Sequence, residues 1–155
     1  MGEVILPWEI DPAADRWLWE KSYIDSRQFP ESVWAEPDSD HMVSQIVKLV
    51  EWLQGSRNWM VGVSQSPKYM RKLYSYLAPT WICTTGGRAS IVDVDKVLRE
   101  ITDPDSPLAD TIEHSDLIII PYCDPAHPGL MYKRGALSSV LQRRKERNRP
   151  TLTDV

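Results

Sequence analysis

Apolar positions recur with a helical period in the stretch that follows the first 39 residues. Residues 40–53, DHMVSQIVKLVEWL, place five apolar side chains at helical spacing, which predicts an amphipathic helix. Ser39 or Asp40 is available as its N-cap, and Gly55 as its terminator. This segment therefore marks the start of the folded body.

Three further stretches show the same period. Residues 67–78, PKYMRKLYSYLA, share an apolar face and begin with a proline, which is favourable in a first helical turn. Residues 90–102, SIVDVDKVLREIT, predict a helix capped by Ser90, followed by a proline-marked loop. Residues 131–147 predict a basic amphipathic helix that Pro150 stops.

Short apolar runs between these helices predict strands. They cover residues 58–64 (NWMVGVS), 80–85 (TWICTT, closed by two glycines), 116–120 (DLIII) and 151–155 (TLTDV). The run at 116–120 is nearly all β-branched, as is typical of a strand covered on both faces. Strands that alternate with helices predict a three-layer α/β fold, with a mainly parallel sheet and helices on both faces.

The first 39 residues have no sustained period and are rich in Pro, Asp and Trp. We expect residues 1–39 to form an irregular arm that packs on the body, with one short helix near Asp15–Tyr23, and residues 40–155 to form the α/β domain. The chain has seven Trp, and four of them fall in this arm: Trp8, Trp17, Trp19 and Trp34. These large aromatic rings are expected to pack the arm onto the body. The alternative is that they form a platform on which nucleic-acid bases stack.

Composition and charge are those of a globular protein, with 42% hydrophobic and 26% charged residues and a net charge of −4. Such a chain has no global basic field that would draw it to nucleic acid or membranes. No apolar run is long enough to cross a bilayer, and the two Cys have no metal-ligand spacing. We therefore expect a cytoplasmic protein without metal or cofactor. Charge is uneven, however, because residues 133–149 hold seven Lys or Arg and one Glu.

The segment GVSQSPKY, residues 62–69, has the register of a phosphate-binding loop between a strand and a helix. A working loop reads G-x-x-x-x-G-K-[ST], and Gly62 and Lys68 occupy the first Gly and Lys positions. Pro67 replaces the second Gly and removes one backbone N–H from the anion cradle. Tyr69 replaces the hydroxyl residue that would ligate Mg²⁺. The segment predicts a phosphate loop that has lost tight Mg·ATP binding.

Three stretches in the right order carry a resemblance to the ATPase domain of DnaC/DnaI-type helicase loaders, a branch of the AAA+ P-loop family. They are GSRNWMVGVSQSPKYMRKLYSYLA, HSDLIIIPYCD and GALSSVLQRRKERNRPTLTDV, and the resemblance covers roughly residues 40–155. It implies a P-loop NTPase-like fold, and as partners a replicative helicase or an intact AAA+ loader.

The chain departs from this family at the positions of the residues that bind Mg²⁺ and hydrolyse ATP. Pro121 and Tyr122 stand where the family has the acidic residues that hold Mg²⁺, and Asp124 is the nearest acid, with Asp116 at the wrong end of the strand. The sensor Asn has no counterpart in TLTDV, and the family's arginine finger and helical lid would lie beyond this segment. The resemblance therefore implies a pseudo-ATPase.

Two groups of candidate site residues follow. A vestigial nucleotide or anion site would use Gly62, Lys68, Arg88 and Asp124. The basic helix would contact nucleic acid or a partner protein through Lys133, Arg134, Arg143, Arg144, Lys145, Arg147 and Arg149.

Three functional hypotheses remain open. The first is a non-catalytic replication accessory protein that acts by protein contact. The second is a small nucleotide- or nucleoside-binding enzyme that uses the carboxyl edge of the sheet, formed by residues 62–68, 84–88 and 122–124. The third is a DNA-binding accessory that uses the basic helix.

Overall fold

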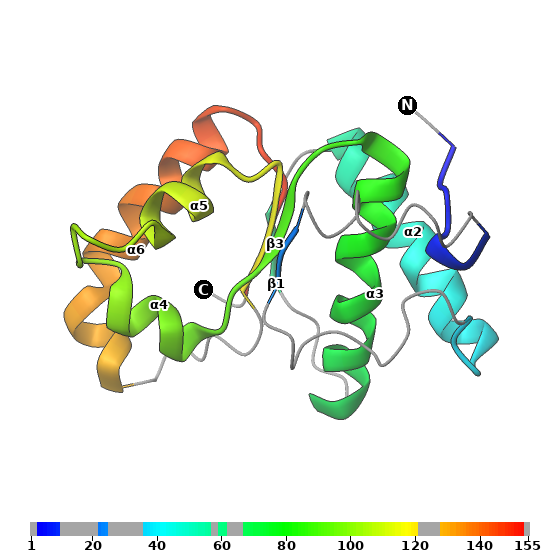
Figure 1. The fold of residues 1–155 in the computed structure, drawn as a ribbon, viewed down its shortest axis with the longest axis horizontal. Coiled ribbons are helices and arrows are strands. Elements are labelled where there is room, and N and C mark those ends of the chain that lie inside the picture. The colour runs from blue at the N-terminus through cyan, green and yellow to red at the C-terminus, as the bar shows by residue number, and fades with distance from the viewer. Residues whose placement is uncertain are drawn as a thin grey trace.

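The structure, a computed structural model, describes residues 3–9, 22–24, 36–56, 59–61, 67–120 and 128–153. A short 3₁₀ turn, η1, comes first, and helices and strands then alternate along most of the chain (Figure 1). Their bounds are η1 Pro7–Glu9, β1 Ser22–Ile24, α2 Asp40–Ser56, β2 Trp59–Val61, α3 Pro67–Thr85, β3 Ala89–Ile91, α4 Val94–Glu100, α5 Leu108–His114, β4 Leu117–Ile120, α6 Pro128–Glu146 and β5 Thr151–Thr153.

The strands form one parallel sheet in the order β1-β3-β4-β5-β2. Helices α2 and α3 cover one face of the sheet, and α4, α5 and α6 cover the other (Figure 1). The predicted three-layer α/β architecture is therefore confirmed. None of the helices that the structure describes is long and apolar enough to span a bilayer.

The central strand β4 explains why the core has two halves. Its side chains alternate between the two faces of the sheet, as the pleat requires. Leu117 and Ile119 pack with α2 and α3, whereas Ile118 and Ile120 pack with α4, α5 and α6. All four are 0% exposed, so the prediction of a strand covered on both faces is confirmed.

Helix α2 begins as its sequence predicts. The Ser39 hydroxyl accepts a hydrogen bond from the Met42 N–H at 3.3 Å and so caps the first turn. Ile46, Val50 and Leu53 are fully buried on the predicted apolar face. Gly55 lies inside the helix, which ends one residue later.

Residues 80–85 are not a strand, and this prediction is wrong. Helix α3 continues through Pro79 to Thr85. The Thr80 and Thr85 hydroxyls each donate to the carbonyl four residues earlier, at 2.8 Å, a bond that a helix offers to threonine. Ile82, like Leu77 in the preceding turn, is completely buried in the core. This burial outweighs the β-propensity of the segment and the single backbone bond that Pro79 removes.

Ser90 is not a helix cap, which is a second correction. Residues 89–91 form β3, where the Ser90 hydroxyl lies 2.6 Å from that of Ser115 in the buried interior. Helix α4 begins at Val94, and the Asp93 carboxylate caps it by accepting from the Asp95 N–H. The proline-marked loop that follows contains a further short helix, α5, which the sequence analysis missed.

The N-terminal residues contact the body through several side chains and through the backbone of Ile5, which is hydrogen-bonded to the Thr84 hydroxyl. Leu6 belongs to the core, and the Trp8 ring meets Tyr76 of α3 edge-on, with ring centroids 5.7 Å apart. Strand β1 pairs with β3 at one border of the sheet. The helix expected near residues 15–23 is wrong at its end, where Ser22 and Tyr23 are in β1, and its other residues lie outside the described chain, as do Trp17, Trp19 and Trp34. A division at residue 39 stays a prediction.

Candidate functional site

The segment predicted to be a degenerate phosphate loop, residues 62–69, follows β2 and runs into the first turn of α3. Pro67 is the first residue of α3, so its missing N–H falls at the helix N-terminus. Tyr69 is half-buried against the core, and its ring centroid lies 6.0 Å from that of His41. Gly62 and Asp124 lie outside the described residues, and of Lys68 the structure describes only the backbone, in the first turn of α3.

Arg88 lies at the opposite edge of the sheet, which corrects its grouping with the loop. Because residues 80–85 are helical, residues 86–88 precede β3 instead of following a strand. Arg88 is exposed, and its backbone N–H donates to the Asp116 carboxylate at 2.7 Å. Thus Arg88 and Asp116 both lie just before parallel strands, at the amino edge.

The basic residues of α6 and the turn after it do not form one free surface. Arg143 bonds the Glu113 carboxylate, and Lys133 is half-buried and donates to the Leu98 carbonyl. Arg149 donates to the His114 carbonyl at 2.6 Å. Lys145 and Arg147 are exposed, and the Arg134 side chain is outside the described part of the structure.

Arg144 is completely buried, so its expected role as a surface contact is wrong. Its guanidinium donates to the carbonyls of Ile112 and Pro150, each at 2.7 Å, to the Ser115 carbonyl and to the Thr151 hydroxyl. Burial lowers the pKa of Arg144 to about 9, which leaves the group charged at neutral pH. Arg144 thus ties the end of α5 to the start of β5.

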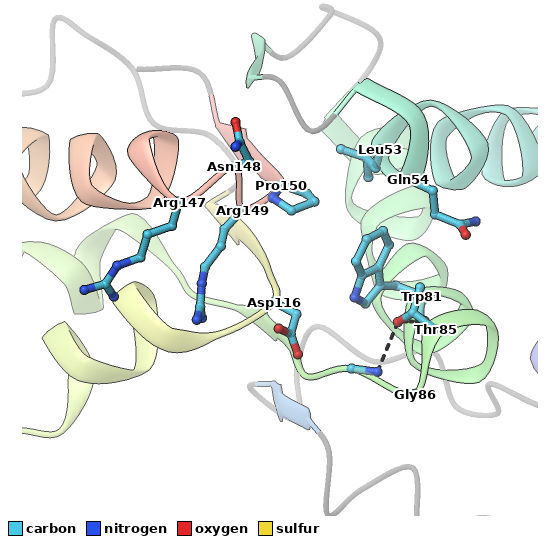
Figure 2. A pocket seen from close by; sticks show the side chains of 11 residues that line it. Leu53, Gln54, Trp81, Thr85, Gly86, Asp116, Arg147, Asn148, Arg149 and Pro150 are labelled. Carbon is cyan, nitrogen blue, oxygen red and sulfur yellow. Dashed lines mark hydrogen bonds between the residues drawn. The ribbon is translucent and has the colours of Figure 1, made fainter. Parts of the chain in front are cut away.

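A pocket of about 650 Å³ opens at the amino edge of the sheet. Figure 2 shows Arg147 and Arg149 extending from the turn after α6 on one side, Trp81 of α3 on the facing side, and Asp116 between them. The end of α2 completes the wall through Leu53 and Gln54. Pockets of this volume are typical of small-ligand sites.

The turn that carries the two arginines is held by a helix-capping motif. Asn148 adopts a left-handed conformation, with φ 54°. Its N–H donates to the Lys145 carbonyl, and the Arg149 N–H donates to the Arg144 carbonyl at 3.0 Å. This pattern is a Schellman motif with Asn in the left-handed position. It fixes the backbone at residues 147 and 149, which line the pocket, while satisfying the last carbonyls of α6.

On the facing wall of the pocket, the space at Gly87 is too small for a side chain. A Cβ atom at this position would lie 2.7 Å from the Asp116 Oδ2 atom, so only glycine fits without movement. Gly86 takes a positive φ of 72° and ends α3, its N–H donating to the Ile82 carbonyl. The predicted role of the glycine pair as a terminator is correct, although the element that it ends is a helix.

Two donors in the pocket wall have no acceptor among the described residues. Trp81 is 6% exposed, and its indole N–H has no hydrogen-bond partner among the residues that the structure describes. The Gln54 side-chain nitrogen is in the same situation. An unsatisfied buried donor costs about 1–3 kcal/mol, which makes such groups candidates for ligand contact.

The sequence analysis missed this pocket. Trp81 was assigned to a strand, which would have placed it elsewhere. Asp116, however, is the first residue of one predicted strand and Arg149 comes two residues before another, and the amino ends of parallel strands meet at one edge. This signal could have grouped the two residues.

A small polar cluster at the end of α5 was also not anticipated. Asp110, Glu113 and His114 hold potential ligand atoms within 4.8 Å of one another. Glu113 already pairs with Arg143, a bond that lowers the pKa of the Glu113 carboxyl below its usual value. Because its charge is compensated and the other two groups are exposed, the cluster is explained as surface electrostatics.

Comparison with known proteins supports the fold. No family model and no curated protein matches the chain. Two solved structures do. One is a proposed primosome component from Streptococcus pyogenes serotype M3, with a TM-score of 0.59 and 15% identity over 88% of this chain and 76% of that one. The other is DnaI, with a TM-score of 0.58 and 13% identity over 88% and 80% of the two chains. The chain therefore shares its α/β fold with this primosome component and with DnaI.

Proposed function

We propose that this chain is a non-catalytic, replication-associated accessory protein that acts by contacting a replicative helicase or an intact AAA+ loader. The observation that carries the proposal is the fold likeness to a primosome component and to DnaI. It is combined with a loop sequence in which Pro67 and Tyr69 replace the second glycine and the hydroxyl residue of a phosphate-binding loop. A fold can keep its outer contact surfaces after the chemistry of its nucleotide site is lost.

The start of α3 supports the non-catalytic part of the proposal. Pro67, as the first helical residue, offers no N–H to an anion at the helix N-terminus, where such groups normally bind phosphate. Tyr69 packs against the core beside His41 and is too bulky to replace a metal-binding hydroxyl. Together these residues remove one phosphate contact and the magnesium contact.

The test is direct binding between purified proteins. The full chain would be titrated into the replicative helicase of the same organism by calorimetry, and into the intact loader in a parallel experiment. Saturable binding to either one is expected. Binding to neither would contradict the proposed partnership.

Nucleotide binding tests the second half of the proposal. We expect Mg·ATP and Mg·ADP not to bind at micromolar concentrations. A matched variant, Pro67→Gly with Tyr69→Thr, rebuilds the G-x-x-x-x-G-K-T register and is expected to bind nucleotide more tightly than the parent chain. Micromolar binding of either nucleotide by the parent chain would refute the proposal that the loop has lost nucleotide binding.

The DNA-binding alternative has less support from the described side chains. Arg144 is buried, and Lys133, Arg143 and Arg149 have protein partners. Lys145 and Arg147 are the exposed cations that a DNA test should change, since replacing Arg144 would disturb the fold instead. A salt-dependent DNA affinity that the double Lys145→Ala, Arg147→Ala variant loses would favour this alternative.

The enzyme alternative loses one of its three segments. Residues 84–88 lie at the amino edge of the sheet, whereas the loop after β2 leaves from the carboxyl edge. The shared site that this hypothesis requires is therefore not formed by those segments. We do not propose it.

A further inference from the structure

We propose that the pocket at the amino edge of the sheet binds a carboxylate group, supplied either by a free small molecule or by an acidic side chain of a peptide. This inference goes beyond the helicase contact proposed above and does not depend on it. The pocket lies at the opposite edge of the sheet from the phosphate loop, so it is also separate from any remnant nucleotide site.

The first argument is the donor set. Trp81 is more than nine-tenths buried, and its indole N–H lacks a partner among the described residues. In Figure 2 the ring nitrogen points toward the side of the pocket where Asp116 lies. Because this N–H has no acceptor within the described part of the chain, an acceptor atom that enters the pocket would satisfy it. An acceptor-rich ligand is therefore favoured over an ammonium or other donor group.

The second argument is the charge of the wall. Arg147 and Arg149 supply two positive charges, and Asp116 supplies one negative charge, which leaves a net charge of +1. The bond from Arg149 to the His114 carbonyl uses one of the five N–H groups of its guanidinium. A monoanion balances this wall. A phosphate, with a charge near −2 at neutral pH, would be repelled more strongly by Asp116.

The helix ends around the pocket do not cancel this charge. Helices α2, α3 and α6 all end here, and a helix C-terminus carries partial negative charge on its unbonded carbonyls. Several of these carbonyls are already bonded, however. The Ile82 carbonyl accepts from Gly86, and the Lys145 and Arg144 carbonyls accept from the capping turn. The guanidinium groups therefore remain available for a ligand.

The third argument is preorganisation. The Schellman turn at Asn148 holds the backbone of the two arginines, and the close approach of Gly87 together with the Arg88 N–H holds the Asp116 carboxylate. A site with such fixed walls binds its ligand at a smaller entropic cost than a flexible surface does.

The experiment follows the Trp81 indole N–H signal by NMR in the full chain, after assignment with a Trp81→Phe variant. Three probes would be titrated separately: propionate, the blocked peptide acetyl-Gly-Glu-Gly-amide and inorganic phosphate. Saturable shifts of this signal with propionate or the peptide, which each carry one negative charge, are expected. Tighter binding of propionate identifies a free carboxylate as the source, and tighter binding of the peptide identifies a protein segment.

Two variants make the test specific. Arg147→Ala removes an exposed cation of the pocket and is expected to weaken carboxylate binding at least about tenfold. Lys145→Ala makes the same change in charge two residues away, outside the pocket lining, and is expected to leave the affinity unchanged. Equal weakening by both variants, tighter binding of phosphate than of both carboxylates, or no saturable shift with either carboxylate would overturn the inference.

Discussion

Replacing Arg144 with methionine should destabilise the protein by about 2–6 kcal/mol. Methionine keeps much of the apolar stem but removes the guanidinium and its bonds. The Pro150 carbonyl retains a bond from the Ile118 N–H at 3.3 Å, and the Thr151 hydroxyl retains one to the Arg149 carbonyl.

The carbonyls of Ile112 and Ser115 account for the magnitude. In the described chain Arg144 provides their main hydrogen bonds, so the substitution leaves both acceptors buried and unsatisfied. Each unsatisfied buried acceptor costs about 1–3 kcal/mol, which gives the range above for two. A domain of this size is usually stable by about 5–15 kcal/mol, so the loss should be easy to measure.

The assay is urea unfolding followed by far-UV circular dichroism. Lys145→Met is the matched control, because it removes an exposed cation from the adjacent position of α6 and should change the unfolding free energy by less than about 0.5 kcal/mol. Arg144→Lys keeps the charge but offers only three donors, and an intermediate loss is expected. If Arg144→Met unfolds within about 0.5 kcal/mol of the parent, the buried guanidinium does not hold α5 to β5.

Three further predictions concern single groups. Asn148→Gly should leave stability nearly unchanged, whereas Asn148→Val should cost about 1–2 kcal/mol in urea unfolding, because a β-branched residue is strained at φ 54°; equal effects would contradict the capping role. The pKa of the Glu113 carboxyl is lowered, chiefly by its hydrogen bond to Arg143, so its contribution to stability is present above its unfolded value of 4.5 and is lost as pH falls through the folded value. The difference in urea midpoint between the parent and Glu113→Gln should therefore shrink on acidification, and a difference independent of pH would refute the assignment. Burial raises the pKa of the Cys83 thiol from 9.0 to about 11, so in a Cys123→Ser background iodoacetamide should alkylate it roughly 100-fold more slowly at neutral pH in the folded than in the unfolded protein; comparable rates would show an accessible thiolate.

The local sequence pattern predicted the element type correctly where a segment had one clear hydrophobic period or one clear helix-capping residue. Residues 40–53 and 116–120 are examples, since an amphipathic stripe and a run of β-branched residues each allow one element type. Residues 80–85 were misassigned because their composition favours a strand and Pro79 precedes them. The deciding factor, burial of Trp81 and Ile82 against the sheet, is not a local property.

The candidate sites also differ in whether the sequence alone could predict them. The departures at Pro67 and Tyr69 are readable from a spacing of a few residues, so the sequence alone predicts a phosphate loop that has lost Mg·ATP binding, and this stays a prediction. The amino-edge pocket could not, because it joins the ends of α2 and α3 to the turn after α6. Arg144 shows the same limit: in the sequence it is one of several cations in a basic run, and only packing distinguishes it.

The amino-acid sequence by itself determined the alternating α/β order and the doubly covered central strand, since these depend on hydrophobic periods within single segments. The tertiary structure decided which cations are free, which edge Arg88 occupies and where Trp81 lies. Burial and edge position depend on which segments pack together, and that is set by contacts between residues far apart in the chain.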